Sequence, residues 1–168
     1  MAQAHFEGDV RTLWLVEGAI GDDGPDRRMQ LLEDFAFVDP SGVRWLAPAS
    51  AKIDGASIPR ALWSLAGDPY SGTYRRASVL HDVACVERKF ASKYVHRMFY
   101  DAMVCDGTSK AQAVEFYLAV RLGGDSWDGP APTPAAVALS RKGPRPKSKK
   151  RRLSFNQVEK ALDAALGE

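Results

Sequence analysis

The chain has 168 residues, a length that fits one domain with its own hydrophobic core. Hydrophobic residues make up 45% and charged residues 26% of the sequence, which is typical of a water-soluble globular protein. No window is apolar over the length that a bilayer requires, and residues 1–9 lack the basic start and the apolar stretch of a signal peptide. We therefore expect no membrane partner and no secretion by a signal peptide.

The two cysteines, Cys85 and Cys105, indicate a reducing compartment. No short metal-type spacing separates them, which argues against a cysteine zinc site and against a disulfide framework. On the helices predicted below they lie on the order of 15 Å apart along the axis, too far for a bridge. We expect both thiols to lie in or near the core without a disulfide.

The first predicted elements are strands. Apolar residues alternate at a period of two from Met29 to Val38, with one break at Glu33, and this pattern predicts a β run with one buried face. Residues 39–42 have the composition of a tight turn, and the alternation resumes over 43–47, which predicts a β-hairpin. A third strand is predicted from Arg11 to Glu17.

From Ser57 onward the pattern changes to helices. A short helix is expected first, with Ser57 as its cap and Pro59 in its first turn. Longer helices are predicted over 73–88, 93–105 and 109–122, the last of which begins at a Ser-x-x-Gln capping box and stops at a Gly-Gly pair. Strands followed by helices indicate the α+β class, with a small antiparallel N-terminal β-sheet and a bundle of three to four helices.

Composition and charge divide the chain into three parts. Residues 1–124 are predicted to form the single α+β domain. Residues 125–152 are rich in Gly and Pro and then in Lys and Arg, and they lack the apolar surface that folding requires, so a disordered linker is expected. Residues 153–168 are predicted to form an amphipathic helix because apolar residues recur there at helical spacing. This stripe consists of Phe155, Val158, Leu162 and Leu166.

A pair of polar residues, His81 and Asp82, lies in the middle of the helix predicted over 73–88. His81 shares a face with small residues and Cys85, whereas the bulky apolar residues lie elsewhere. If the next helix folds back antiparallel, the positions opposite His81 are roughly 96–99, which brings His96 close.

These residues and Tyr100 form a predicted cluster of two imidazoles, a carboxylate and a phenol. The cluster could bind a divalent metal ion through Asp82, His81 and His96, or it could share a proton. An imidazole that activates water, beside a carboxylate, is the minimal equipment for hydrolysis. The alternative is structural: Asp82 would pair with a basic residue on the helix surface, Arg75 or Lys89, and His81 would donate to a carbonyl.

The segment from Asp54 to Arg60 concentrates a second set of polar residues. A carboxylate at Asp54 leaves a strand, a Gly-Ala pair follows, and Ser57 and Arg60 lie at the beginning of a helix. The backbone N–H groups of such a segment could hold an anion or orient the carboxylate. The alternative is a strand-to-helix connection that needs no ligand and is capped by Asp54 or Ser57.

A set of motifs extends along the predicted domain: Asp54-Gly55-Ala56-Ser57-Ile58-Pro59-Arg60, Trp63, Gly72-Thr73-Tyr74, Ala77, Leu80-His81-Asp82, Arg97-Met98-Phe99-Tyr100-Asp101-Ala102-Met103 and Val120-Arg121. Together these motifs resemble the phage and prophage domain-of-unknown-function family numbered 1353, over about residues 5–124. The family usually has Thr in place of Ile53, an aromatic pair in place of Val83 and Cys85, and Asp in place of His96. The resemblance implies a phage-associated protein, located in the host cytoplasm or in the virion.

The helical His-Asp pair with a partner on an antiparallel helix also resembles bacterial secreted phospholipases A2. In that family the histidine activates water and the aspartate holds calcium. Its glycine-rich calcium loop and its disulfides are missing here. The two resemblances together lead us to expect a phage-associated protein of unidentified activity whose candidate reaction is metal-assisted hydrolysis. In this hypothesis the catalytic residues are His81, Asp82 and Asp54. The residues that bind substrate are Ser57, Arg60 and Tyr100.

The basic tail supports a second function class. Residues 141–152 hold eight basic residues and no acidic one, whereas residues 1–140 hold 14 Lys and Arg against 18 Asp and Glu. Such a tail could bind nucleic acid phosphates without sequence preference. The contacts would come from Arg141, Lys142, Arg145, Lys147, Lys149, Lys150, Arg151 and Arg152. In this alternative the protein is a noncatalytic phage structural or accessory component, and its C-terminal helix docks on a phage subunit or on another copy of the chain.

Overall fold

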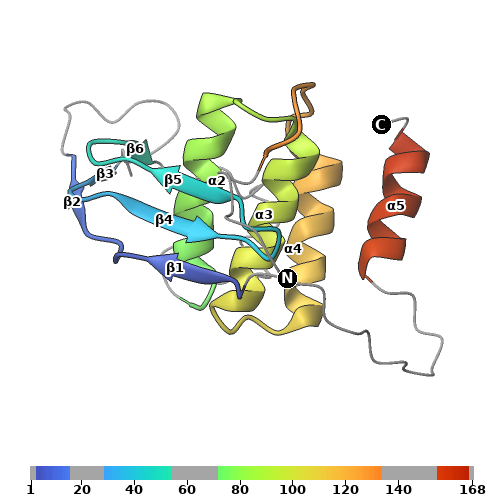
Figure 1. The fold of residues 1–168 in the computed structure, drawn as a ribbon, viewed down its shortest axis with the longest axis horizontal. Helices are drawn as coiled ribbons and strands as arrows, with labels where there is room; N and C mark the ends of the chain where they lie inside the picture. Colours follow the sequence, from blue (N-terminus) through green and yellow to red (C-terminus); the bar gives the residue numbers. More distant parts are fainter. Residues whose placement is uncertain (1–2, 16–28, 54–71, 134–154, 167–168) are drawn as a thin grey trace, which may run out of the picture. The chain divides into compact units, whose positions relative to one another are not determined.

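The computed structural model describes residues 3–15, 29–53, 72–133 and 155–166. The chain forms two compact units, Met1–Val137 and Ala138–Glu168. Within its described ranges, the first unit contains two three-stranded antiparallel sheets followed by helices (Figure 1). This arrangement confirms the α+β class, although the predicted single sheet is two sheets.

The first sheet has the strand order β1-β4-β5. Its strands are β1 (His5–Glu7), β4 (Phe35–Val38) and β5 (Arg44–Ala47). The predicted hairpin is confirmed, because β4 pairs antiparallel with β5 in a register that places Phe37 opposite Trp45. One carboxylate, Asp39, holds the turn: it accepts the backbone N–H groups of Ser41 and Val43 at 2.8 and 3.0 Å and the indole N–H of Trp45 at 3.0 Å.

The second sheet has the order β2-β3-β6. Its strands are β2 (Thr12–Trp14), β3 (Met29–Leu31) and β6 (Lys52–Ile53). The run predicted from Met29 to Val38 is therefore two strands in different sheets. It breaks after β3, where the backbone of Leu32 donates to Arg11 at 2.9 Å and the carboxylate of Asp34 accepts the N–H of Ala49 at 2.7 Å.

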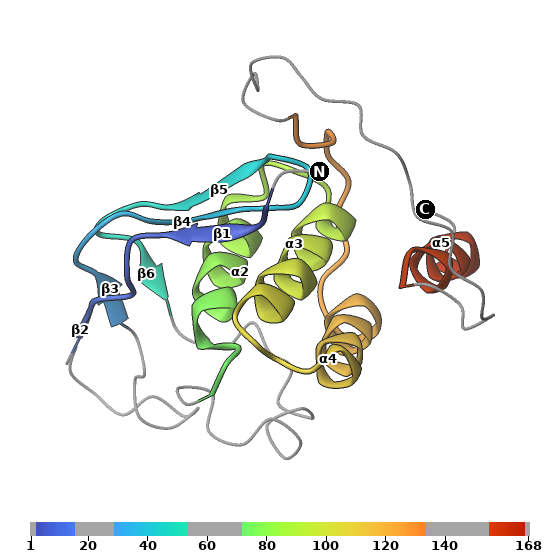
Figure 2. The same cartoon turned by 60° about the horizontal axis from the view of Figure 1, so that its bottom comes forward.

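Three helices of the first unit follow the predicted ranges within a few residues. They are α2 (Arg75–Glu87), α3 (Ser92–Cys105) and α4 (Lys110–Gly123). The cap predicted for the last is confirmed, since the Ser109 hydroxyl accepts the N–H of Gln112 at 3.3 Å. Helix α3 packs between α2 and α4, as Figure 2 shows.

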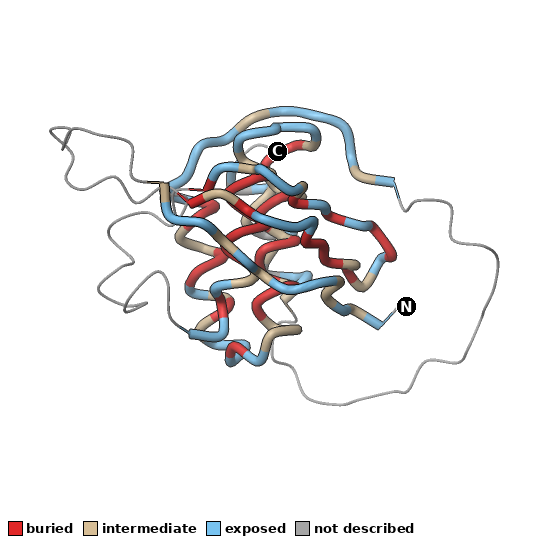
Figure 3. Tube along the Cα trace, turned by 90° about the vertical axis from the view of Figure 1, so that its left-hand side faces the viewer, coloured by how far each residue is buried: buried red, intermediate tan, exposed pale blue. Residues whose placement is uncertain are grey.

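The core lies where α2 packs against β4, β5 and β6 and where the three helices meet. Figure 3 marks the buried residues in red along the chain. The largest fully buried aromatic side chains of the core are Phe35, Phe37, Phe99, Phe116 and Tyr117. Burial of such side chains removes about 150–250 Å² of apolar surface each from water, so they dominate the packing energy.

Residues 125–133 follow α4, and we call them the strap. The strap lies against the α2–α3 turn: Trp127 donates its backbone N–H to the Ser92 hydroxyl at 3.2 Å and its indole N–H to the Phe90 carbonyl at 2.7 Å. Ser92 in turn donates its backbone N–H to the Trp127 carbonyl at 3.0 Å, and Ala91 donates to Pro130 at 3.3 Å. Residues 125–152 were predicted to form a linker. The structure shows that this segment begins with residues that are hydrogen-bonded to the rest of the first unit.

The second unit contains α5 (Phe155–Leu166). Phe155 and Leu162 on this helix are half-buried, whereas the polar residues Asn156 and Gln157 are exposed. None of the helices in the described ranges combines the length and the apolar character needed to cross a bilayer.

Candidate histidine pair

The α2–α3 hairpin brings two histidines into direct contact. His81 Nε2 lies 2.9 Å from His96 Nδ1, which is a hydrogen bond between the rings. Both side chains are buried, with 1% and 3% of their surface exposed. The hairpin geometry predicted for position 81 is therefore confirmed.

Apolar rings and one thiol surround the pair. The Phe99 ring lies 4.6 Å from that of His81 between centroids, and the edge of Trp127 meets His96 at 5.9 Å. Cys85 Sγ lies 3.8 Å from His81 Nδ1 and 3.7 Å from Nε2, one helical turn further along α2. This environment keeps water away from both imidazoles.

Burial controls the charge of His81. Desolvation lowers the pKa of His81 well below its ordinary value of 6.5, and the neighbouring His96 lowers it further. His81 is therefore neutral at pH 7, with one ring nitrogen as donor and the other as acceptor. When Nε2 donates to His96, Nδ1 carries the basic lone pair, and it is the nitrogen left to take a proton from another group.

Asp82 is buried, with 4% of its surface exposed. This burial does not match the surface position that the structural alternative gave Asp82, in which it pairs with Arg75 or Lys89. Lys89 pairs with Glu87 at 2.8 Å. Asp82 follows His81 on α2 and so lies about 100° further around the helix. A carboxylate and an imidazole thus enter the interior from neighbouring faces of one helix.

The distance between the two rings favours a shared proton. Two nitrogens that bind one tetrahedral zinc ion lie roughly 3.3 Å apart when each is about 2.0–2.1 Å from the metal. The facing nitrogens of His81 and His96 are closer, at 2.9 Å. Across the described ranges, no group of three or more His, Cys, Asp or Glu side chains is arranged to hold a metal. Of the two possibilities left open by the sequence, the geometry matches proton sharing.

Other predicted site residues lie elsewhere or outside the described residues. Tyr100 is buried, and its ring meets that of Tyr117 on α4, with 6.2 Å between centroids. Asp54, Ser57 and Arg60 lie outside the described residues, and so does the basic segment 141–152. The structure thus brings together His81 and His96, with Asp82 next to His81 on the helix.

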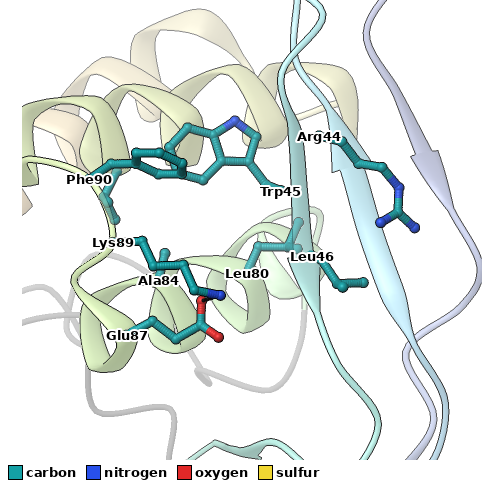
Figure 4. A pocket seen from close by; sticks show the side chains of 9 residues that line it. Arg44, Trp45, Leu46, Leu80, Ala84, Glu87, Lys89 and Phe90 are labelled. Atoms are coloured by element: carbon teal, nitrogen blue, oxygen red, sulfur yellow. Dashed lines mark ion pairs between the residues drawn. The ribbon is translucent and has the colours of Figure 1, made fainter. Parts of the chain in front are cut away.

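A hollow of about 170 Å³ opens beside α2, between β5 and the α2–α3 turn (Figure 4). Leu80 and Ala84 line it from α2, and the Glu87–Lys89 ion pair lies beside it. Leu80 lies about 100° around the helix from His81. A second hollow, of about 390 Å³, lies between the β4–β5 turn, α3 and Pro132 of the strap. The residues lining these two hollows do not include the histidines.

One residue of the site, Trp127, was not predicted from the sequence. The Gly- and Pro-rich composition around it indicated a linker, yet its ring makes an edge contact with that of His96 and its N–H groups bind the α2–α3 turn. A tryptophan in a segment with little other apolar surface is the signal that could have identified this contact, because such a side chain stabilises a fold by being buried.

The fold and the site define an α+β domain with a buried histidine pair on a helical hairpin. The chain belongs to the family described as "Protein of unknown function (DUF1353)", whose model matches residues 29–120. This finding confirms the family resemblance. The matched range includes both histidines and ends near the C-terminus of α4.

Two curated relatives come from Sinorhizobium fredii (strain NBRC 101917 / NGR234). The uncharacterized proteins y4jT and y4iH are 38% and 37% identical to this chain over 110 residues, which is 66% of this chain. The matched part covers 33% and 46% of the relatives' own lengths, so the chain corresponds to less than half of either. No solved structure matches the chain.

Proposed function

We propose that the domain is a hydrolase in which His81 is the general base and His96 orients it. The observation that carries this proposal is the buried 2.9 Å hydrogen bond between the two imidazoles. A base held by a second group is the common element of catalytic histidine sites, because the bond fixes both the ring orientation and the tautomer.

The lowered pKa of His81 suits a base that must be neutral at physiological pH. In the proposed reaction the Nδ1 lone pair removes a proton from a water molecule while the water oxygen bonds to a carbonyl carbon or a phosphorus atom. The protonated ring then gives this proton to the leaving group as the bond to that group breaks. Asp82 and Asp54 would orient the reacting groups, Ser57 and Tyr100 would bind substrate, and Arg60 would contact an anionic part of it. The use of a metal ion in this reaction and the association of the protein with phage stay predictions.

Hydrolysis assays test the proposal. The full chain is offered fluorogenic carboxylic esters, amides and phosphodiesters, beside the variant His81→Gln. Removal of a general base should lower kcat by about 10²-fold or more. Since only neutral His81 accepts a proton, kcat/KM should be flat above pH 6.5 and should fall in acid through a pKa below that value.

Two variants of His96 distinguish orientation from packing. His96→Asn keeps an acceptor near the position of Nδ1 and should retain most of the activity, whereas His96→Leu removes the acceptor and should lower kcat with little change in KM. His5→Gln is the matched control, because His5 is an exposed histidine. Equal kcat values for the Asn and Leu variants, both folded, would contradict an orienting role.

The noncatalytic alternative has its own support. Both imidazoles are buried, as expected of side chains that hold two helices together, and residues 141–152 carry eight positive charges. In this second proposal the basic segment binds nucleic acid, and α5 docks on a phage subunit or on another copy of the chain.

Sedimentation of the full chain with duplex DNA at two salt concentrations tests this alternative. Its control is a full-length variant with all eight Lys and Arg of 141–152 replaced by Ser. Binding by the native chain should weaken steeply with salt, because each phosphate contact releases counterions, and the variant should not bind. Equal sedimentation of the two proteins with DNA would exclude a role of these charges.

A further inference from the structure

Strand β5 lies at an open edge of its sheet. In the strand order β1-β4-β5 of the described residues, β4 pairs with one side of β5 and no strand pairs with the other. The backbone N–H and C=O groups on such an open side can form hydrogen bonds with another extended chain. The register of the hairpin determines which residues carry these groups.

The register places the outward groups at positions 44 and 46. Asp39 donates its backbone N–H to the Val43 carbonyl at 2.9 Å, so these two residues form a hydrogen-bonded pair of the ladder. Hydrogen-bonded and non-hydrogen-bonded pairs alternate along an antiparallel ladder, so Trp45 bonds to β4. Arg44 and Leu46 therefore direct their backbone N–H and C=O groups away from β4. The described part of the chain offers these outward groups no hydrogen-bond partner.

The smaller of the two hollows, of about 170 Å³, lies at this open edge (Figure 4). Arg44, Trp45 and Leu46 all line it, although successive side chains of a strand point to opposite faces of a sheet. A hollow that three consecutive strand residues line must therefore reach the edge, where both faces of the strand are accessible. Leu80 and Ala84 of α2 line the hollow from the other side, so it lies between the open edge and the helix.

The hollow has an apolar interior and a charged rim. The rim carries the ion pair of Glu87 with Lys89, which are 2.8 Å apart. Pockets for whole small-molecule ligands measure roughly 300–1,000 Å³, so this smaller volume fits a single aliphatic side chain. The apolar lining comes from β5, α2, the α2–α3 turn and α3, and consists of Trp45, Leu46, Leu80, Ala84, Phe90 and Val95.

We propose that the β5 edge binds an extended peptide segment of a partner protein, which adds to the sheet as a strand antiparallel to β5. The added backbone exchanges hydrogen bonds with Arg44 and Leu46. Its residue opposite Trp45 points to the same face as Trp45, so it enters the hollow and should be aliphatic. This inference is independent of the proposed hydrolysis, because it concerns a surface that the histidines do not line.

Charge complementarity specifies the residue opposite Arg44. The Arg44 side chain is 43% exposed and donates its Nε–H to Glu7 at 2.7 Å. A guanidinium has five N–H donors, so this bond leaves donors for a second carboxylate. Residues opposite each other in neighbouring strands lie side by side on one face, and opposite charges there attract. An acidic residue therefore fits opposite Arg44, and an apolar residue fits opposite Leu46, whose side chain is 38% exposed.

A second copy of the chain fits the hollow less well than a peptide segment does. Two β5 edges could pair about a two-fold axis. However, the inner-face residues of β5 are Trp45 and Ala47, which are buried in their own core with 6% and 0% of their surface exposed. A second β5 therefore has no side chain to place in the hollow, whereas a segment outside a folded sheet does.

A fluorescent peptide of sequence Ser-Thr-Val-Leu-Glu-Thr-Ser, capped at both ends, tests the inference by fluorescence anisotropy with the full chain. In the antiparallel register its Val, Leu and Glu lie opposite Leu46, Trp45 and Arg44. Replacement of the peptide Leu by Ser should weaken binding about tenfold or more, because the hollow then receives no apolar side chain. No saturable binding up to about 1 mM peptide would overturn the inference.

Methylation of single peptide nitrogens distinguishes strand addition from apolar contact alone. The N–H groups of the peptide Val and Glu face β5, so N-methylation of either should weaken binding about tenfold. The N–H of the peptide Leu points away from β5, and its methylation should change binding less than about twofold. Equal effects at the three positions would contradict strand addition.

Two variants of the protein block the edge and the hollow separately. Leu46→Pro removes a nitrogen donor that points away from β4, so the sheet should be kept and peptide binding lost. Ala84→Leu fills the half-buried wall of the hollow and should also abolish binding. Val86→Leu is its matched control, because Val86 lies on the same helix, is 80% exposed and does not line the hollow. Native affinity in both blocking variants, each of them folded, would refute the proposed site.

Charge reversal tests the register and the choice of partner. Arg44→Glu should weaken binding of the Glu peptide about two- to fivefold, and a peptide with Lys in place of Glu should then bind better to this variant than to the native chain. An unchanged preference would contradict the antiparallel register. Sedimentation of the chain without peptide covers the other occupant: dimers that Leu46→Pro dissociates would assign the edge to a second copy and overturn the inference.

Discussion

At the scale of single residues, the neutral state of His81 links the fold to pH. Folding buries the ring and depresses its pKa, whereas in the unfolded chain it takes a proton near pH 6.5. Protons therefore stabilise the unfolded state as the pH falls below that value. The free energy of unfolding should decrease by up to about 1.4 kcal/mol per pH unit from this residue, until the folded pKa is reached.

Urea unfolding between pH 7.5 and 5 measures this slope. The His81→Gln variant should show a smaller dependence on pH than the native chain, because Gln does not titrate. His5→Gln is the control, because it makes the same substitution at an exposed histidine outside the pair. A native slope in the His81→Gln protein would show that another group causes the pH dependence.

The partner of His81 should set the basicity of the pair. His96→Asp replaces a second imidazole with a carboxylate, which favours the charged form of His81. The pKa of His81 should rise in this variant, and the acid limb of the activity profile should move to higher pH. NMR titration of the imidazole protons checks this directly, and His96→Asn, which adds no charge, is the control.

At the scale of elements, the helical hairpin was accessible to prediction because its signals are local. A short turn between Glu87 and Ser92 separates the two helices, and equal rise per residue then places His81 opposite positions 96–99. The β run from Met29 to Val38 was not accessible in the same way. Its alternation has one break, at Glu33, and resumes with Phe35 and Phe37. Only the bonds of Leu32 to Arg11 and of Asp34 to Ala49, two residues outside the run, divide it into two strands.

The strap makes a prediction at the same scale. A Cβ at Gly129 would lie 2.8 Å from the backbone nitrogen of Ala91 and 2.9 Å from the carbonyl carbon of Phe90, and backbone atoms cannot move aside as a side chain can. Gly129→Ala should lower the free energy of unfolding by about 1–3 kcal/mol. Thermal and urea unfolding check this value. The neighbouring Asp128 is exposed, so Asp128→Ala should change stability by less than about 0.5 kcal/mol.

At the scale of the whole molecule, the strap belongs to the first unit and so places the end of that unit beyond α4. The sequence placed the boundary at Gly124 because composition changes there, whereas the compact unit extends to Val137. A chain that ends at Val137 should melt at the temperature of the full chain. A chain that ends at Gly124 loses the Trp127 hydrogen bonds and should melt several degrees lower. Equal melting temperatures for the two truncated chains would show that the strap adds no stability.

The candidate site was predictable in part because the contact between its two histidines is local. His81 and His96 belong to neighbouring helices, so counting along the helices found their contact. Trp127 reaches the pair from residues beyond α4, and no periodic pattern in the sequence indicates such a contact. The segment 54–60 carries the family signature and stays a prediction, as do the roles of Asp54, Ser57 and Arg60.

The hydrogen bond between the histidines joins residues that are 15 positions apart in the chain. Closing so short a loop costs little conformational entropy, and contacts of this kind tend to form early in folding. The pairing of β1 with β4 and the docking of the strap close loops about twice as long, since His5 pairs with Val38 and Trp127 binds Ser92. We therefore expect the imidazole pair to assemble with the nascent hairpin, so that the sheet and the strap close over a centre that already exists.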